Sequence, residues 1–589
     1  MTSAVEQAPT RLEPKALPSS IEFTLSPDRT QYVRRLHGRE RSSACSSQYS
    51  EGCMHQYGNV HMAFKEPISQ QELYRLARVA WMKLRFQAPW IAYRCSALEN
   101  ASEPNTFFFS YDVVGHNPKL APNGLKPLEA WADESIVMHD ELMTFAEWEM
   151  EMKEVFWLPS EGHFGTELHI ARGVDDRHWL LMFSIPHSTT DARGMFSLSD
   201  VYFKLLTKEA QGSKRSDYVP YQKLPWGEEV IRLTPAPSVM IPDVGEERPL
   251  IPDPSTKVQF TRQPFPSQSI PISLNHRLLR GDSLLDKIVL SPSETRAISL
   301  VCSKARCTLT TLLNSVLLLA DVERTLKTLY ADAKKQNSQS LLNMIEENWQ
   351  KSETWTIPAN PVDIRSYMYP RYQALHGTGT SGGVVNLMVP TYHSMTAIRK
   401  CLSFKDGKVY RAWHDNPAYF WDDLLKDTKT LLKAGSKASS ASSLLLDQPP
   451  SAFHKSVILA EQLSPLIGTP GSESLFPKPI GMIPSSIGSM ERLGLYRDIS
   501  PLTQKAKMGT DAEPPFLMVD MAVGVRTNNT MLTTTTIWEY NGTIVMNTQA
   551  SKRHQTAEGW EIFGQAVRDG LKEIVKGVIS EKKTTRAVL

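Results

Sequence analysis

Residues 178–206 read HWLLMFSIPHSTTDARGMFSLSDVYFKLL, and this stretch decides how the surrounding chain is arranged. Its first part, 178–185, is a β-rich and mostly apolar run of the length typical of a strand. Residues 166–171 form a second β-rich run, and the turn residues between the two runs predict a β-hairpin. After residue 194 the apolar side chains recur at helical spacing. The pattern therefore predicts a strand, a tight turn and a helix.

The turn contains a histidine and an aspartate in the pattern HxxxD. A side chain at the end of a strand is accessible to a substrate, and imidazole is basic at cellular pH because its usual pKa is about 6.5. Asp191 can orient His187 or fix the turn, and Gly194 lets the chain enter the helix closely. The alternative is a histidine that only ends a strand. The hairpin before the turn and the apolar helix after it favour His187 as a general base.

The composition is that of a globular protein with more than one hydrophobic core. The chain has 589 residues, of which 41% are hydrophobic and 22% are charged, whereas a single core stops growing at about 250–300 residues. The 65 basic and 63 acidic residues give a formal net charge of +2. A nucleic-acid binder typically carries a strongly basic surface, so we expect no nucleic-acid partner.

The sequence has no pattern typical of a metal site or a disulfide framework. None of the cysteines forms a CxxC pair or lies beside a histidine cluster; they are Cys45, Cys53, Cys95, Cys302, Cys307 and Cys401. Several other histidines lack the helical spacing of metal ligands and are expected to be structural or exposed: His61, His163, His169, His376 and His414. We expect reduced thiols, no bound metal and no permanent cofactor.

The N-terminal residues contain prolines and charges where a signal peptide needs an apolar segment. The longest strongly apolar stretch, Leu312–Val322, is too short to span a bilayer and predicts a buried helix instead. These features predict a soluble, cytoplasmic protein without a membrane partner, and we expect a monomer.

Strands and helices are mixed along the chain without a repeat of fixed length, which predicts an α/β (α+β) protein with mixed sheets. Between residues 211 and 275 prolines recur too densely for regular elements. We interpret this segment as an extended connection rather than a third domain. The predicted parts are an irregular N-terminal leader (1–50), a first lobe with the HxxxD motif (51–210), a Pro-rich linker (211–280) and a second lobe (281–589).

Local patterns predict further elements around this framework. Strands are expected at Pro89–Tyr93, Thr356–Arg365 and Gly383–Val389, and a helix at Asp140–Val155. The motif Ser485-Ser486-Ile487-Gly488 predicts a small polar turn. Its hydroxyls can donate to an oxyanion or contact a substrate, although serine-rich turns without such a role are equally common.

Residues 377–383 read GTGTSGG and match two functional patterns, GxGxxG and GxSxG. A dinucleotide site or a hydrolase nucleophile elbow requires a strand before the glycines and a helix after them. Here a strand is predicted after the glycines and an irregular stretch before them. The pattern favours a flexible loop beside the active site.

The order of these features resembles the coenzyme A-dependent acyltransferase and condensation-domain superfamily, which includes chloramphenicol acetyltransferase and the BAHD enzymes. The resemblance covers roughly residues 50–580. Within the superfamily, the chain is most similar to fungal trichothecene 15-O-acetyltransferases, through LPWGEEV at 224–230 and HSTTDARG at 187–194. The segments that carry the wider resemblance are the HxxxD turn, IVLSPSET at 288–295, TLTTLL at 308–313, VDIR at 362–365, the Ser-Ser-x-Gly motif and a C-terminal strand pair.

Three residues or motifs differ from other branches of the superfamily. Pro186 stands where condensation domains have a second histidine, and Ala192 follows the aspartate where a glycine is usual. The string DFGWG, the second BAHD signature, is absent from the sequence. The resemblance is therefore to the superfamily rather than to its plant-type BAHD branch.

The resemblance implies two chloramphenicol acetyltransferase-like lobes with an active-site tunnel between them. It implies transfer of an acetyl or other acyl group from acetyl-CoA or another acyl-CoA, the co-substrate, to a hydroxyl of a secondary metabolite of the trichothecene type. In this scheme His187 acts as the base without an acyl-enzyme or a metal. Asp191 points away from the substrate and pairs with Arg365 of the second lobe. The alternative for Asp191 is that it only caps the following helix.

Two other functions remain compatible with the same residues. A condensation-type ester or amide former takes its acyl group from a carrier protein and has no activity with free acyl-CoA. A non-catalytic acyl-binding protein keeps the fold without the reaction, although the intact His187 and Asp191 favour an enzyme.

Overall fold

The computed structural model describes most of both predicted lobes. Side chains of the last helix are described as far as residue 576. The described residues are 20–98, 103–119, 121–212, 218–242, 265, 283–376, 382–433, 449–468, 481–510, 512–527 and 532–586.

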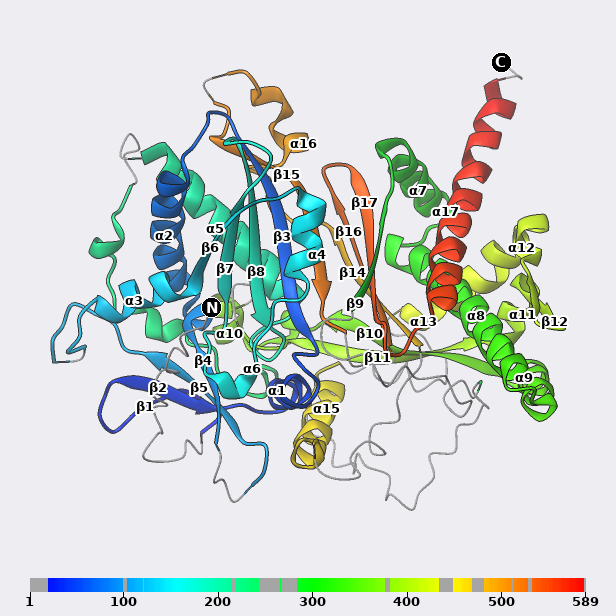
Figure 1. The fold of residues 1–589 in the computed structure, drawn as a ribbon, viewed down its shortest axis with the longest axis horizontal. Helices are drawn as coiled ribbons and strands as arrows, with labels where there is room; N and C mark the ends of the chain where they lie inside the picture. The colour runs from blue at the N-terminus through cyan, green and yellow to red at the C-terminus, as the bar shows by residue number, and fades with distance from the viewer. Residues whose placement is uncertain are drawn as a thin grey trace, which may run out of the picture.

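The first lobe is built on a five-stranded sheet (Figure 1). All neighbouring strands are antiparallel except β6 and β7, which are parallel. The predicted hairpin is present as β7 and β8. The strand order is β15 (Phe516–Val525), β3 (His55–Phe64), β8 (His178–Pro186), β7 (Glu167–Arg172) and β6 (Ile136–Leu142).

Strand β8 is apolar over residues 179–183, where both of its faces are buried. Leu181 and Phe183 belong to the cluster that includes residues of α2 (Gln70–Gln87) and α5 (Ala192–Gln211). The alternate residues Leu180 and Met182 face the other way and pack with Trp148 of α4 (Phe145–Met152). Side chains alternate across a strand, so a strand covered on both faces needs an unbroken apolar run.

The second lobe contains a four-stranded sheet against which long helices pack (Figure 1). Its strand order is β14 (Gly481–Ser489), β16 (Leu532–Tyr540), β17 (Thr543–Ser551) and β9 (Ser283–Val289). The helices are α7 (Pro292–Lys304), α8 (Leu309–Lys335) and α17 (Ala557–Arg586). No single helix among the described residues is long and apolar enough to cross a membrane; α7 and α8 reach that composition only as a pair bent by 104°.

Two features connect the lobes. Strand β15 follows β14 in the sequence, yet it pairs with β3 in the sheet of the first lobe. The side-chain amide of Asn547, on β17 of the second lobe, donates to the carbonyl oxygen of Val523 on β15 at 2.8 Å. The antiparallel pair β10 (Thr354–Asp363) and β11 (Asn386–Ser394) lies below the lower ends of both sheets in Figure 1 and extends from one lobe toward the other. A division of the chain at residue 281 therefore does not separate the two sheets.

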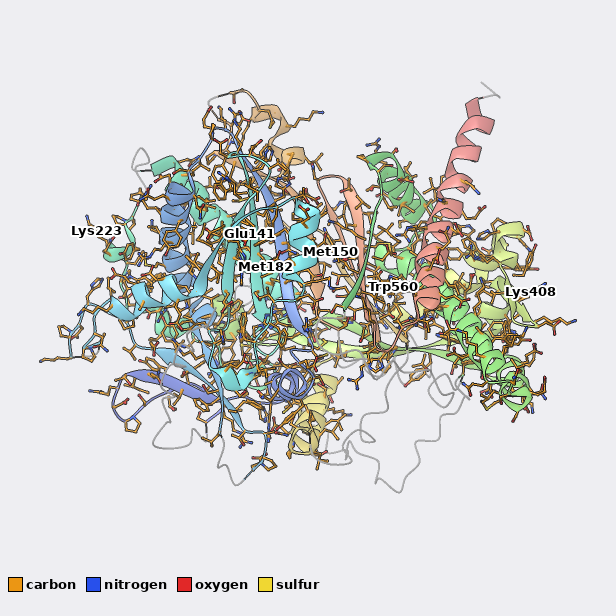
Figure 2. All side chains as sticks on the ribbon, in the orientation of Figure 1. Glu141, Met150, Met182, Lys223, Lys408 and Trp560 are labelled. Carbon is orange, nitrogen blue, oxygen red and sulfur yellow. The ribbon has the colours of Figure 1, made fainter. Side chains whose placement is uncertain are left out.

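Each lobe has its own hydrophobic core, as the chain length predicts. Met182 lies inside the first lobe, whereas the exposed Lys223 and Lys408 lie near opposite ends of the long axis (Figure 2). The core of the second lobe is centred on α8, whose buried residues continue beyond the predicted apolar stretch to Ala333. Packing against α7 and α17 explains why this helix is so apolar.

The predicted irregular leader (1–50) is wrong for its second half. Residues 20–50 contain β1 (Thr24–Leu25), β2 (Gln31–Arg35) and α1 (Arg39–Tyr49). The guanidinium of Arg34 holds the carboxylate of Glu40 through two bonds of 2.7 and 2.8 Å, and both side chains are 0% exposed. Helix α1 has few apolar residues, so hydrophobic periodicity does not reveal it; buried ion pairs hold it instead.

The described part of the predicted linker, 218–242, contains only short helical turns. They are η4 (Tyr221–Lys223), η5 (Glu229–Arg232) and α6 (Pro237–Met240). Trp226 and Leu233 belong to the core of the first lobe. Residues 211 and 212 end helix α5. The other residues of the predicted linker, apart from 218–242 and Phe265, lie outside the described residues, and the linker as a whole stays a prediction.

Two local predictions are corrected. Pro89–Ala92 is a 3₁₀ helix rather than a strand, because proline favours the first position of a helix; the strand β4 (Arg94–Ala97) follows it. The segment predicted as one helix, Asp140–Val155, begins in the edge strand β6, and α4 starts only after the capping box of Thr144. Charged residues are common on edge strands, which explains the misassignment. The strands expected at 356–365 and 383–389 are present as β10 and β11 with shifted ends.

We expect Glu40→Gln to lower the free energy of unfolding by about 3–5 kcal/mol, because it leaves the buried Arg34 charge without its carboxylate. Glu72→Gln breaks an exposed pair with Arg75 and should cost less than about 1 kcal/mol. Urea denaturation measures both. Equal, small effects of the two substitutions would contradict the structural role of this N-terminal segment.

Candidate active site

The HxxxD turn is fixed by backbone hydrogen bonds from three sides. Within the turn, the Thr189 amide donates to the Pro186 carbonyl oxygen at 2.9 Å. From the second lobe, the Gly383 amide donates to the Thr189 carbonyl oxygen at 2.6 Å. From β3, the side-chain amide of Gln56 donates to the Thr190 carbonyl oxygen at 2.8 Å. The turn therefore has little freedom to move between the lobes.

The carboxylate of Asp191 both caps a helix and forms an ion pair. Its Oδ1 accepts the Gly194 amide at 3.1 Å, so it is the N-cap of α5. The same oxygen lies 2.9 Å from Nη2 of Arg365, and both side chains are 4% exposed. Its Oδ2 accepts the Val385 amide at 3.0 Å. The expected interlobe pair is present, and the helix cap is an additional contact rather than an alternative to it.

Charge complementarity keeps both members of this pair ionised. Burial raises the pKa of Asp191, but the charge and hydrogen bond of Arg365 and the bond from Gly194 outweigh it, so the pKa is lowered overall. Burial also opposes the charge of Arg365, yet Asp191 and Asp363 raise its pKa. Asp363 lies 3.1 Å from Nη1 of Arg365. Asp191 therefore holds Arg365 in place, and both side chains also border the cavity described below.

The pKa of His187 is lowered from its usual value, which favours a neutral imidazole. Burial lowers its pKa most, the positive charge of Arg39 lowers it further, and Asp191 and the backbone groups of His187 and Thr190 partly oppose the shift. The Nδ1 atom is buried and makes no hydrogen bond of normal geometry, whereas the side chain borders a cavity. A ligand in this cavity can therefore reach the imidazole.

Arg39 is a site residue that the sequence did not indicate. It is the first residue of α1, and its Nη1 donates to the Asn386 carbonyl oxygen at 3.3 Å. Burial lowers its pKa to about 10, while Asp191 acts in the opposite direction. It is one of several arginines in a segment without periodicity, and no local motif distinguishes it.

A cavity of about 360 Å³ lies between the lobes beside His187, a size typical of small-molecule sites. One wall comes from the first lobe and from β15, and includes Gln56, Ala192 and Val523. The other comes from β10, β11, β14 and β16 of the second lobe. Its apolar lining includes Met54, Met388, Ile483, Ile487 and Leu493.

Ser485 and Ser486 line this cavity, but they are not in a turn as predicted. They lie in β14, which runs parallel to β16. The Pro, Ser and Gly residues of this strand are typical of turns, and the pairing with β16 overrides their local preference. Ser485 is paired in register with Thr536, which also lines the cavity. Thr534 and Thr536 were missed because a run of threonines predicts only a strand.

A second cavity, which we call the vestibule, adjoins the first. It has a volume of about 500 Å³, and both cavities are lined by Pro361 and Ser486. Ser486 accepts a hydrogen bond from the hydroxyl of Thr310 at 2.8 Å. None of the described residues that line the vestibule is acidic, and its basic residues are Arg306, Lys429 and Lys433. This arrangement favours an anionic ligand.

The glycine-rich stretch ends beside the HxxxD turn. Residues 377–381, with the predicted flexible loop, lie outside the described residues. The Gly382 amide donates to the Thr234 hydroxyl at 3.2 Å. A side chain at Gly382 would meet the ring of Trp90 at about 3 Å. The segment before the glycines is the helix α10 (Pro370–His376) and the segment after them is β11, the reverse of what a dinucleotide site or a hydrolase elbow requires.

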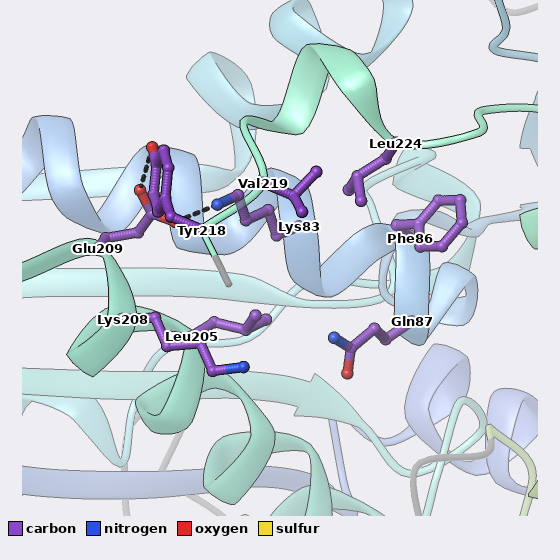
Figure 3. Close-up of a pocket in the computed structure, with 9 residues that line it drawn as sticks. All are labelled: Lys83, Phe86, Gln87, Leu205, Lys208, Glu209, Tyr218, Val219 and Leu224. Atoms are coloured by element: carbon purple, nitrogen blue, oxygen red, sulfur yellow. Dashed lines mark hydrogen bonds and ion pairs between the residues drawn. The ribbon is translucent and has the colours of Figure 1, made fainter. Parts of the chain in front are cut away.

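A smaller pocket lies between α2 and α5 (Figure 3). There the Lys83 ammonium forms an ion pair with Glu209 and lies 4.3 Å from the ring centroid of Tyr218. The Tyr218 hydroxyl donates to Glu209 at 3.0 Å. These polar groups satisfy one another, and the pocket shares no lining residue with the His187 cavity.

The described residues contain no group of three or more His, Cys, Asp or Glu side chains arranged to hold a metal ion. His163 and His169 both bind Glu167, each at 3.1 Å. His376 is buried against Tyr372 at the end of α10.

A double-mutant cycle tests whether Asp191 acts mainly as a cap or mainly as an ion-pair partner. Asparagine is as good an N-cap as aspartate, so Asp191→Asn keeps the cap and removes the charge. We expect it to cost about 3–5 kcal/mol of unfolding free energy, and Asp191→Ala about 1 kcal/mol more. Combination with Arg365→Met should be strongly non-additive. An Asp191→Asn protein as stable as wild type would contradict the ion-pair role.

No protein-family model and no curated protein sequence matches the chain. Among solved structures, it is similar to the trichothecene 15-O-acetyltransferase TRI3 from Fusarium sporotrichioides, with a TM-score of 0.67, 14% identity, and coverage of 96% of this chain and 99% of that chain. F. graminearum TRI101 complexed with coenzyme A and T-2 mycotoxin has a TM-score of 0.46 and 11% identity over 90% of this chain and 98% of that chain. The epimerization domain from the third module of tyrocidine synthetase B has a TM-score of 0.46 and 11% identity, over 90% of this chain and 93% of that chain.

At 14% identity, the likeness to the trichothecene 15-O-acetyltransferase shows the fold. The chain has the two-lobed fold of that acetyltransferase, and the predicted α/β (α+β) class with mixed sheets is confirmed.

Proposed function

We propose that this protein is an acyl-CoA-dependent O-acyltransferase, and that it transfers an acetyl group to a hydroxyl of a trichothecene-type sesquiterpenoid. One observation carries the proposal: a neutral His187, on a turn fixed by the buried Asp191–Arg365 pair, borders a cavity between the lobes. The similarity in fold to a trichothecene 15-O-acetyltransferase supports it.

In the proposed reaction His187 is the general base. Nε2 accepts the proton of the acceptor hydroxyl while the alcohol oxygen attacks the carbonyl carbon of the thioester. The tetrahedral intermediate then collapses, the carbon–sulfur bond breaks, and the imidazolium returns the proton to the leaving thiolate. The acyl group passes directly to the alcohol, without an acyl-enzyme. Base catalysis of this kind contributes about 10²–10⁴-fold, and positioning in the cavity adds to it.

The hydroxyls of β14 and β16 are the candidate donors to the oxyanion of the intermediate. Ser485 and Thr536 lie in register on neighbouring strands and both line the cavity. Donors that are already in place stabilise the developing charge without reorganisation. Ser486 binds Thr310 at the boundary with the vestibule, so its role is to shape the passage between the two cavities.

The two cavities favour different substrates. The basic vestibule suits the phosphates of acyl-CoA, and the thioester then reaches the base past Pro361 and Ser486. The His187 cavity has several apolar walls, among them Met388, Ile483 and Leu493, which suit an apolar polycyclic alcohol. We propose acetyl-CoA as a co-substrate that is not permanently bound.

A condensation-type enzyme fed by a carrier protein and a non-catalytic acyl-binding protein are the alternatives. Coenzyme A release during incubation of acetyl-CoA with a panel of alcohols distinguishes them. The proposed acyltransferase releases one coenzyme A for each ester formed. A carrier-dependent enzyme releases none from free acetyl-CoA but acts on acyl-carrier protein, and the non-catalytic protein is inactive with both donors.

We expect His187→Ala to lower kcat by at least about 10³-fold while the protein stays folded, because the base is lost and the buried Asp191–Arg365 pair is retained. His116→Ala, at an exposed histidine of the same lobe, serves as the control and should retain wild-type activity. Steady-state kinetics and circular dichroism measure the two quantities. A His187→Ala protein with a tenth or more of the wild-type kcat would remove His187 from the base role.

The pH profile should depend on Arg39. The pKa of His187 is lowered by burial and by the charge of Arg39, so wild-type activity should be lost only below about pH 6.5. Arg39→Gln removes the cation, raises the pKa of His187, and therefore moves the acid limb of kcat/KM to higher pH. Arg29→Gln, at an exposed position, should leave the profile unchanged. Superimposable profiles for Arg39→Gln and wild type would contradict this electrostatic coupling.

A further inference from the structure

Two cysteines lie together where α7 ends and α8 begins. The Cys307 amide donates to the Cys302 carbonyl oxygen at 3.0 Å, and the Arg306 amide donates to the Ser303 carbonyl oxygen at 3.3 Å. Arg306 between them has φ +49°. This is the Schellman motif that ends many helices. It brings the side chains of Cys302 and Cys307 together.

The two thiols interact but differ in exposure. The Cys302 thiol is buried, whereas Cys307 is partly exposed and lines the vestibule. The hydrogen bond between the two thiols raises the pKa of Cys302 and lowers the pKa of Cys307. The contact therefore places a buried thiol directly behind an accessible one.

The surroundings of Cys307 favour a thiolate for two further reasons. Cys307 immediately precedes Thr308, the N-cap of the 27-residue helix α8, and the positive end of a helix dipole stabilises a negative charge. The Lys429 ammonium also lowers the pKa of Cys307. Burial, in contrast, raises the pKa of Cys45, Cys53 and Cys401 to about 12, so these thiols are unreactive at neutral pH.

We propose that Cys307 and Cys302 form a peroxide-reactive dithiol, with Cys307 as the attacking thiolate and Cys302 as the resolving thiol. The Cys307 sulfur attacks one oxygen of hydrogen peroxide, the O–O bond breaks, and a sulfenic acid and hydroxide form. The Cys302 sulfur then attacks the sulfenic sulfur, a disulfide forms, and the second oxygen leaves as water. Two thiols are oxidised and one hydrogen peroxide is reduced to two waters.

The motif permits this step without unfolding. A disulfide needs Cα atoms within about 4.4–6.8 Å of each other, and the backbone bond from Cys307 to Cys302 keeps the two residues within one turn of chain. The disulfide would form at the edge of the vestibule, whose lining includes Arg306, Cys307 and Thr308. The inference concerns covalent chemistry and does not rest on the proposed acyl transfer.

The full-length protein, treated with an equimolar amount of hydrogen peroxide and then alkylated, tests the proposal by mass spectrometry. In wild type we expect an intact mass lower by two hydrogens before alkylation. After alkylation we expect Cys302 and Cys307 to lack their labels together, while the other cysteines stay labelled. In Cys302→Ser we expect a Cys307 sulfenic acid that dimedone traps. In Cys307→Ser we expect Cys302 to stay alkylated after peroxide treatment.

Lys429→Gln gives a second test at an exposed position that does not disturb the buried thiol. We expect peroxide to react more slowly with Cys307 in this variant at neutral pH, and the midpoint of the rate against pH to move upward. The proposal is overturned if Cys307 of wild type remains fully alkylated after peroxide treatment, or if its rate of oxidation matches that of the buried cysteines.

Discussion

The arrangement of the two lobes around the base depends on one buried carboxylate. Asp191 accepts hydrogen bonds from the start of its own helix and from Arg365 and the Val385 amide of the second lobe. A carboxylate without partners at this depth would cost several kcal/mol. The contacts of Asp191 with Arg365 and Val385 offset this cost and also join the two lobes beside His187. The same contacts therefore contribute to the stability of the fold and to the geometry of the site.

The joined lobes leave two spaces of different character on either side of Pro361 and Ser486. On one side His187 borders a cavity whose walls combine aliphatic side chains with strand hydroxyls. On the other side basic residues and the N-terminus of α8 favour negative charge. On the first side, burial and the positive charge of Arg39 lower the pKa of His187 and keep its imidazole neutral. On the second side, the basic residues of the vestibule attract anions. The hydrogen bond with Cys302 lowers the pKa of Cys307 most, and the Lys429 ammonium lowers it further.

The strand, turn and helix around His187 were predictable because they are local: one apolar run, one turn and one helical periodicity. The Asp191–Arg365 pair followed from the family resemblance, not from spacing, because 174 residues separate the partners. Three features escaped prediction for physical reasons. β15 follows β14 of the second lobe in sequence but pairs with β3 in the sheet of the first lobe, which is a long-range contact. Arg39 lies on a helix that is held by ion pairs rather than by an apolar face. Ser485 belongs to a strand whose composition is typical of a turn.

The central claim is that His187 transfers an acyl group from a coenzyme A thioester directly to an alcohol. The most direct measurement is mass spectrometry of products after incubation with acetyl-CoA and a library of sesquiterpenoid alcohols, for wild type and a folded His187→Ala variant. The account predicts an alcohol heavier by one acetyl group, one coenzyme A released for each ester, and loss of both with His187→Ala. Equal product from the two proteins, or an acetylated enzyme trapped on the way to the ester, would contradict it.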